Sequence, residues 1–168
     1  MAERRLTAMV RALHDAGVEF VVVGGLSATL NGVPINTFDV DVVHRRTPEN
    51  VDRILPVLEA LDAVYRIQPE RRLRPVRSAL LSTGHQNLIT KHGPLDILGE
   101  IGSGLGYEEL VPRSTQMLIA EGVRVRVLNL ETFIEVKEQL NGEKDRAMLP
   151  VLRRTLEATI RKGHHDSN

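Results

Sequence analysis

Apolar residues recur along the chain with two different spacings, one typical of helices and one typical of strands. Near the N-terminus, Leu6, Met9, Val10 and Leu13 lie at i, i+3, i+4 and i+7, which is one face of an amphipathic helix. Gly17 then predicts the end of that helix. The next run, "VEFVVVGG", is apolar almost throughout and predicts a strand buried on both faces, followed by a short helix over "LSATLNG".

Strict alternation replaces this pattern in "TFDVDVVH". There Phe38, Val40 and Val42 are predicted on one face of a strand, and Asp39 and Asp41 on the other. Residues 47–63 then predict a helix capped by Thr47. Three further strands are predicted in "AVYRI", "QNLITK" and "PLDILGE". "MLIAEGVRVRVLN" predicts a hairpin or short strand pair that turns at Glu121-Gly122. Residues 68–84 show no regular pattern.

The C-terminal part is predicted to form two helices. "LETFIEVKEQL" and "EKDRAMLPVLRRTLEATIRK" are separated by Asn141-Gly142, and Pro150 is expected to bend or interrupt the second helix. The whole pattern predicts an α+β fold, a small mixed β-sheet flanked by helices with a helical C-terminal segment. We expect one domain over residues 1–168, with an α/β core in 1–128 and C-terminal helices in 129–162.

Composition narrows the function classes only a little. Lys and Arg number 22, as do Asp and Glu, so net charge gives no hint of a nucleic-acid or membrane partner. The absence of Cys excludes disulfides and thiolate metal sites and fits a cytoplasmic protein. No apolar run approaches the roughly 18 residues of a membrane span, so no membrane association is expected.

Carboxylates on predicted core strands are the first candidate chemistry. Asp39 and Asp41 project from one face of their strand, close enough to share a cation, and Asp96 is a lone acid in the apolar run "GPLDILGE". If the two strands are neighbours, three carboxylates converge. That geometry suits Mg²⁺ or Mn²⁺ and leaves one carboxylate to accept a proton. The alternative is that Asp39 and Asp41 face solvent on a half-exposed strand.

The glycine pair upstream is the second candidate feature. A strand that ends in Gly24-Gly25 and leads at once into a helix turns backbone N–H groups toward an anion, and Ser27 can add a hydroxyl to the same phosphate. The alternative is a tight turn that needs glycine for backbone reasons alone.

Taken together, "GG", then "DVD" and a later "LDIL" strand resemble the nucleotidyltransferase superfamily related to DNA polymerase beta. The resemblance implies that Gly24, Gly25 and Ser27 hold a nucleoside triphosphate such as ATP. It implies metal ligation by Asp39 and Asp41, with Asp96 as third ligand and base.

The C-terminal residues "FIEVKEQLNGEKDRAMLPVL" are similar to the small prokaryotic nucleotidyltransferases of toxin–antitoxin and phage-defence systems. This resemblance implies that Lys137 lies near the nucleotide, and that a cognate antitoxin or toxin protein is a partner. Lys144 and Asp145 could as easily join the two helices, or all three residues could form an exposed charged face. One departure is that Ile35 stands where many relatives carry an arginine before Thr37.

Residues 66–77, "RIQPERRLRPVR", carry five arginines against one glutamate. They could follow the phosphates of an RNA acceptor or reach over the triphosphate, or they could form a solvated loop whose charge is balanced elsewhere.

The sequence thus predicts a metal-dependent nucleotidyltransferase that moves a nucleoside monophosphate from a triphosphate to an acceptor hydroxyl on RNA or protein, with release of pyrophosphate. The alternative is a non-catalytic nucleotide- or RNA-binding module of the same fold, acting with a partner protein.

Overall fold

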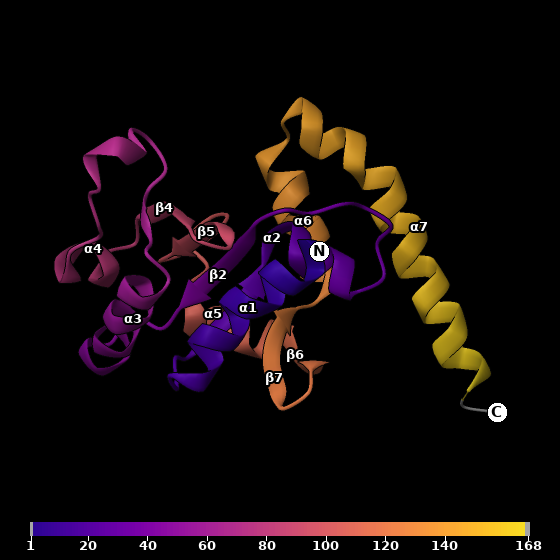
Figure 1. The fold of residues 1–168 in the computed structure, drawn as a ribbon. Coiled ribbons are helices and arrows are strands. Elements are labelled where there is room, and N and C mark those ends of the chain that lie inside the picture. Colours follow the sequence, from indigo (N-terminus) through magenta and orange to yellow (C-terminus); the bar gives the residue numbers. More distant parts are fainter. Residues whose placement is uncertain (1, 167–168) are drawn as a thin grey trace.

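A seven-stranded mixed sheet with the strand order β3-β4-β5-β2-β1-β7-β6 organises the molecule (Figure 1). The computed structural model of the chain describes residues 2–166. The strands are β1 (Phe20–Val23), β2 (Val40–His44), β3 (Val64–Tyr65), β4 (His85–Thr90), β5 (Gly93–Leu98), β6 (Ser114–Ala120) and β7 (Val123–Leu128). The helices are α1 (Ala2–Asp15), α2 (Gly24–Leu30), α3 (Pro48–Ala60), α4 (Arg77–Leu81), α5 (Tyr107–Leu110), α6 (Leu130–Leu140) and α7 (Glu143–His165), with short 3₁₀ turns at Pro69–Arg71 and Val111–Arg113.

The sheet is mixed because β2 runs antiparallel to β1 but parallel to β5, and β1 runs parallel to β7. Two hairpins, β4–β5 and β6–β7, complete it on either side, with β3 pairing at the β4 edge. The predicted α+β fold with a mixed sheet and a C-terminal pair of helices is therefore confirmed.

Each face of the sheet has its own apolar cluster. The first packs α1 and α3 against the sheet and includes Val40 and Val42 of β2 with Leu95 and Ile97 of β5. The second lies on the other face under α2, α6 and α7, and includes Val43 and Leu98. Side chains alternate along a strand, so residues between Val40 and Val42, or between Leu95 and Ile97, point to the second face.

The predicted alternation of β2 is wrong at its start. Phe38 is 66% exposed and lies before the strand, which begins at Val40. On the β1 side the paired strand ends at Val23, opposite Asp41, where the chain turns into α2, so β1 does not extend alongside Phe38.

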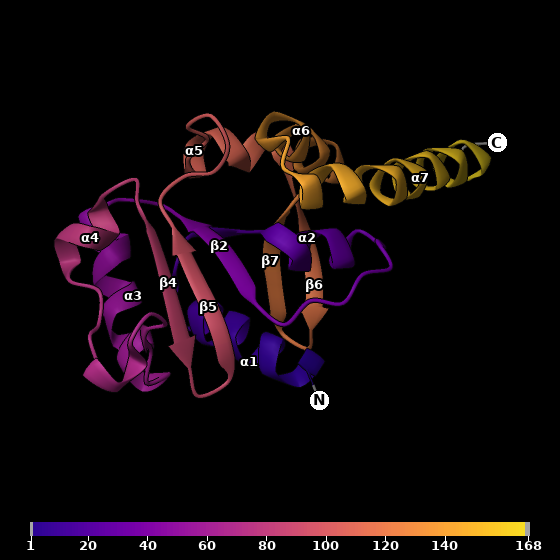
Figure 2. The same ribbon diagram turned by 90° about the horizontal axis from the view of Figure 1, so that it is seen from above.

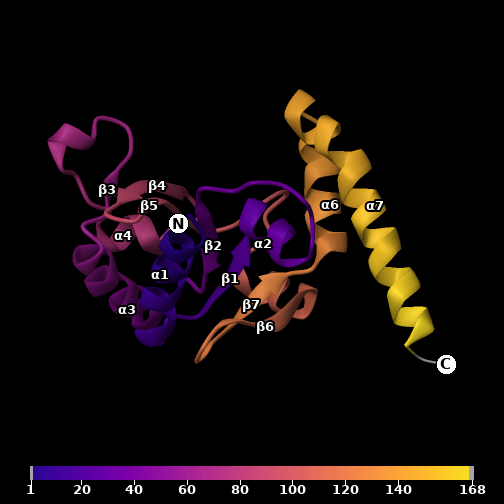
Figure 3. The same ribbon diagram turned by 45° about the vertical axis from the view of Figure 1, so that its right-hand side comes forward.

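Helix α7 is continuous through Pro150, so of the predicted bend or interruption the interruption is wrong. Residues on both sides of the proline, Leu149 and Val151, pack with the second apolar cluster, and this packing favours continuation of the helix through Pro150. Figures 1 and 3 show α7 beside α6 and its C-terminal half extending away from the sheet. Leu152 is the one residue of 143–165 that is buried.

Among residues 2–166, no helix combines the length and the apolar character that crossing a membrane would need.

We expect Leu152→Ala to lower the free energy of unfolding by about 2–5 kcal/mol, because it leaves a cavity where α7 meets the second cluster. Ile160→Ala, on the same helix but 48% exposed, is the matched control and should change it by less than about 0.5 kcal/mol. Urea unfolding of both variants measures the difference, and equal effects would show that Leu152 does not anchor the helix.

Candidate functional site

Three carboxylates meet where β2 and β5 lie side by side. Asp41 of β2 is directly opposite Asp96 of β5 in the parallel ladder, and Asp39 immediately precedes β2. One ligand atom from each carboxylate lies within 4.8 Å of the others. The predicted convergence is therefore confirmed, whereas their role in binding metal stays a prediction.

The acids occupy the sheet face that α2 and α6 cover only in part. Asp41 lies between Val40 and Val42, and Asp96 between Leu95 and Ile97, so both project away from α1 and α3. Figure 2 shows α2 over the β7 side of the sheet, while β4 and β5 are uncovered in the same view. Asp39 is exposed and Asp41 and Asp96 are half-buried, so solvent reaches the cluster.

Burial and the closeness of the three carboxylates raise the pKa of Asp41. Burial, then a hydrogen bond to Asp96 and repulsion from Asp96 and Asp39, raise the pKa of Asp41 to about 8, and attraction to Arg66 only partly opposes them. A bound cation would favour the ionised form instead and would displace this proton.

The donor set fits a hard divalent cation. All three candidate ligands are carboxylate oxygens, which Mg²⁺ and Mn²⁺ prefer over nitrogen or sulfur donors. The Oδ1 atom of Asp96 is buried and accepts no hydrogen bond from any residue of 2–166. A buried carboxylate oxygen without a hydrogen bond is unfavourable unless a positive charge compensates it, and the Arg66 guanidinium lies 3.1 Å from this atom.

Two further polar residues extend the row of acids across the sheet. Asn87 of β4 lies opposite Asp96 and is exposed. Arg66, just after β3, donates its backbone N–H to the Asn87 carbonyl (3.0 Å), and its Nη2 lies 3.1 Å from Asp96 Oδ1. The alternation of polar and apolar residues in "QNLIT" could have predicted that Asn87 lies on the same face of the sheet as the acids. No local pattern in the sequence predicts that Arg66 pairs with Asp96.

Three of the four other arginines of residues 66–77 form ion pairs within the chain, and Arg71 contacts the side chain of Gln68. Arg72 and Arg74 both pair with Asp62, and Arg77 pairs with Asp52 at 2.8 Å. These ion pairs favour the interpretation of a loop whose charge is balanced locally over that of an RNA-binding strip.

The glycine turn lies directly against the acids. Gly24 begins α2 with φ +64°, and a Cβ atom there would be 2.0 Å from Asp41 Oδ2. A Cβ on Gly25 would be 3.1 Å from Thr37 Oγ1. Glycine is thus required at position 24 both for its backbone conformation and for the close approach of Asp41.

Ser27 lies within the same turn, but its hydroxyl is used internally. The residue is fully buried, and its Oγ donates a hydrogen bond of 2.7 Å to the Gly24 carbonyl. In this structure Ser27 fixes the turn that positions Gly24 and Gly25.

Lys137 joins the two C-terminal helices. Its Nζ on α6 donates a hydrogen bond of 2.9 Å to Asp145 Oδ1 on α7 and lies 5.4 Å from the centre of the Phe133 ring. Asp145 therefore takes the helix-joining role that the sequence left open.

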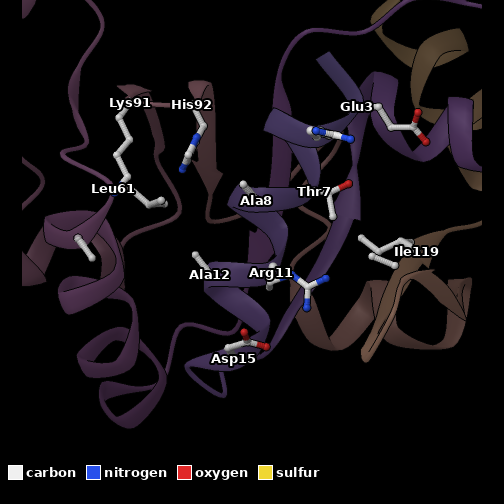
Figure 4. Close-up of a pocket in the computed structure, with 13 residues that line it drawn as sticks. Glu3, Thr7, Ala8, Arg11, Ala12, Asp15, Leu61, Lys91, His92 and Ile119 are labelled. Carbon is white, nitrogen blue, oxygen red and sulfur yellow. The ribbon is translucent and has the colours of Figure 1, made fainter. Parts of the chain in front are cut away.

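A cavity of about 740 Å³ lies on the other face of the sheet. It is lined by α1, by Leu61 at the end of α3, by the β4–β5 turn and by the end of β6. Figure 4 shows Lys91 and His92 on one side of it and Ala8 and Ala12 of α1 on the other. None of the three acids lines it.

The arrangement of strands and helices is shared with a solved structure. A Thermotoga maritima protein described as a "putative nucleotidyltransferase" matches over 97% of this chain and 92% of its own, with a TM-score of 0.53 and 20% sequence identity. At this identity the likeness shows the fold, so the chain has a nucleotidyltransferase-like fold that carries an acidic cluster. The sequence matches no protein-family profile. It also matches no curated protein.

We expect Gly24→Ala to abolish Mn²⁺ binding, because the added methyl group takes the space of the Asp41 carboxylate. Gly122→Ala is the matched control, since Gly122 also has a positive φ (+71°) but faces open space. Both variants should lose about 1–2 kcal/mol of stability from backbone strain. Calorimetric titration with Mn²⁺ separates them, and retained binding in Gly24→Ala would contradict the close packing.

The raised pKa of Asp41 predicts a pH-dependent loss of stability in metal-free protein. Between pH 4 and 8 the folded state keeps a proton that the unfolded state releases, so the free energy of unfolding falls as pH rises. Asp41→Asn lacks this titration. Its melting temperature in EDTA should therefore rise relative to the unsubstituted protein across that window, and a constant difference from pH 4 to 8 would exclude the shift.

Proposed function

We propose that the protein is a metal-dependent nucleotidyltransferase that moves a nucleoside monophosphate from a nucleoside triphosphate to an acceptor hydroxyl. The observation that carries the proposal is the meeting of Asp39, Asp41 and Asp96 beside the glycine turn, on a nucleotidyltransferase-like fold.

In this proposal Asp39, Asp41 and Asp96 hold Mg²⁺ or Mn²⁺, which supplies charge neutralisation on the phosphate oxygens. Backbone N–H groups at Gly24 and Gly25 face the triphosphate, and Ser27 keeps their turn in place. The acceptor oxygen bonds to the α-phosphorus, the bond to the bridging oxygen breaks, and pyrophosphate leaves. Asp96 accepts the proton of the attacking hydroxyl.

The finer identities rest on the resemblance of the sequence. They are ATP or another nucleoside triphosphate as donor, RNA or protein as acceptor, and a cognate antitoxin or toxin protein as partner. Lys137 belongs to the proposed nucleotide-binding set on the same ground, although its ion pair with Asp145 favours a structural role.

A non-catalytic binding module of the same fold is the second candidate, favoured by one observation. Ile35, where relatives carry an arginine, packs against the second apolar cluster and lines a cavity with Leu26 and Leu30. The site therefore lacks a cation there. Binding of nucleotide without any transfer would favour this candidate.

Label transfer tests the reaction. Protein, Mg²⁺ or Mn²⁺ and each α-labelled nucleoside triphosphate are incubated with total RNA and with protein extract. We expect label on one acceptor class, and a loss of at least about 100-fold in Asp39→Asn and Asp41→Asn, because each removes a charge that neutralises the metal.

Asp15→Asn is the control, because it removes an exposed carboxylate from α1, away from the three acids. This variant should transfer label as the unsubstituted protein does. Labelling that persists in Asp39→Asn and Asp41→Asn would contradict the assigned site.

A further inference from the structure

Arg66 lies at the acidic site, although it comes from a different part of the chain. Its backbone is held by β4 through the Asn87 carbonyl, and its Nη1 donates to the Leu88 carbonyl at 3.2 Å. From there Nη2 reaches Asp96 Oδ1 at 3.1 Å. The contact is an ion pair without hydrogen-bond geometry, which is why that buried oxygen accepts no hydrogen bond within residues 2–166.

A divalent cation and this guanidinium compete for the same carboxylate. Mg²⁺ approaches its oxygen ligands to about 2.1 Å. A cation on Asp96 Oδ1 would then lie at most about 5 Å from Nη2, and two positive groups at that distance repel strongly in a partly buried site. The guanidinium therefore has to leave Asp96 when a metal binds there.

The Arg66 side chain is 38% exposed, so solvent reaches the guanidinium. To leave Asp96, the side chain gives up the ion pair and the Nη1 hydrogen bond to the Leu88 carbonyl. A triphosphate is the ligand that would receive it, because the planar guanidinium fork matches phosphate oxygens.

We propose that Arg66 occupies the cation position at Asp96 in the metal-free protein and yields it to the divalent metal by transferring to the triphosphate. Metal alone binds weakly, because it must displace Arg66 without a new partner for the guanidinium. Nucleotide supplies that partner, so metal and nucleotide each raise the affinity for the other by the same factor. This inference rests on the proposed function and adds a nucleotide-binding residue to it.

The test measures Mn²⁺ affinity by calorimetry, alone and with a non-hydrolysable α,β-methylene analogue of ATP. We expect Arg66→Gln to bind Mn²⁺ alone about tenfold more tightly than the unsubstituted protein, and to lose most of the coupling between Mn²⁺ and the analogue. A purely structural role for Arg66 predicts the opposite sign, since a disturbed site would bind Mn²⁺ more weakly.

Arg71→Gln is the matched control. It removes the same charge from the same segment, and Arg71 contacts the side chain of Gln68 rather than an acid of the site. Its Mn²⁺ affinity should stay within about twofold of the unsubstituted protein. Tightening as large as in Arg66→Gln would assign the effect to net charge and overturn the proposal.

Arg66→Lys provides a second variant if Arg66→Gln does not fold. It keeps the charge without the planar fork, so Mn²⁺ affinity should stay near that of the unsubstituted protein while the coupling to the analogue falls several-fold. Full coupling in Arg66→Lys would overturn the transfer to phosphate.

The outcomes separate this inference from the proposed function. If the unsubstituted protein binds Mn²⁺ and analogue but folded Arg66→Gln binds Mn²⁺ no more tightly, only the role of Arg66 is wrong. If neither protein binds Mn²⁺, the metal site fails and both proposals fall together.

Discussion

Repulsion among three carboxylates is the constraint around which the site is built. The parallel ladder places Asp41 opposite Asp96, and the chain entering β2 brings Asp39 to the same point. Separated in solution, these groups would ionise independently, but here the pKa of Asp41 rises to about 8. A sheet is rigid enough to hold such an arrangement, and the rest of the molecule supplies the stability that the crowding removes.

The surrounding elements accommodate the acids in different ways. On one side Gly24 leaves room for the Asp41 carboxylate, and Ser27 fixes the turn that contains it. On the other side Arg66 places a positive charge beside Asp96. The opposite face of the same strands is closed by α1 and α3, so the apolar core and the acidic site share β2 and β5 without mixing.

In the C-terminal helices, a lysine that the sequence assigned to nucleotide binding makes a structural contact in the folded chain. Lys137 and Asp145 are eight residues apart and belong to different helices, and their hydrogen bond joins α6 to α7. Arg153 and Glu138 form a second ion pair between the same helices. With Leu152 buried beneath them, these contacts account for the position of α7 while leaving its C-terminal half outside the core.

Much of the fold and part of the site follow from local sequence. Periodicity located the strands and long helices, and alternation in "TFDVDVVH" put Asp39 and Asp41 together, because every second residue along a strand points to the same face. Contacts between distant segments carry no such local signal. The pairing of β2 with β5, the ion pair of Arg66 with Asp96, and the exposure of Phe38 depend on which strands become neighbours and where they end. Tertiary structure alone decided those, since burial and charge pairing are set by everything that packs around a residue.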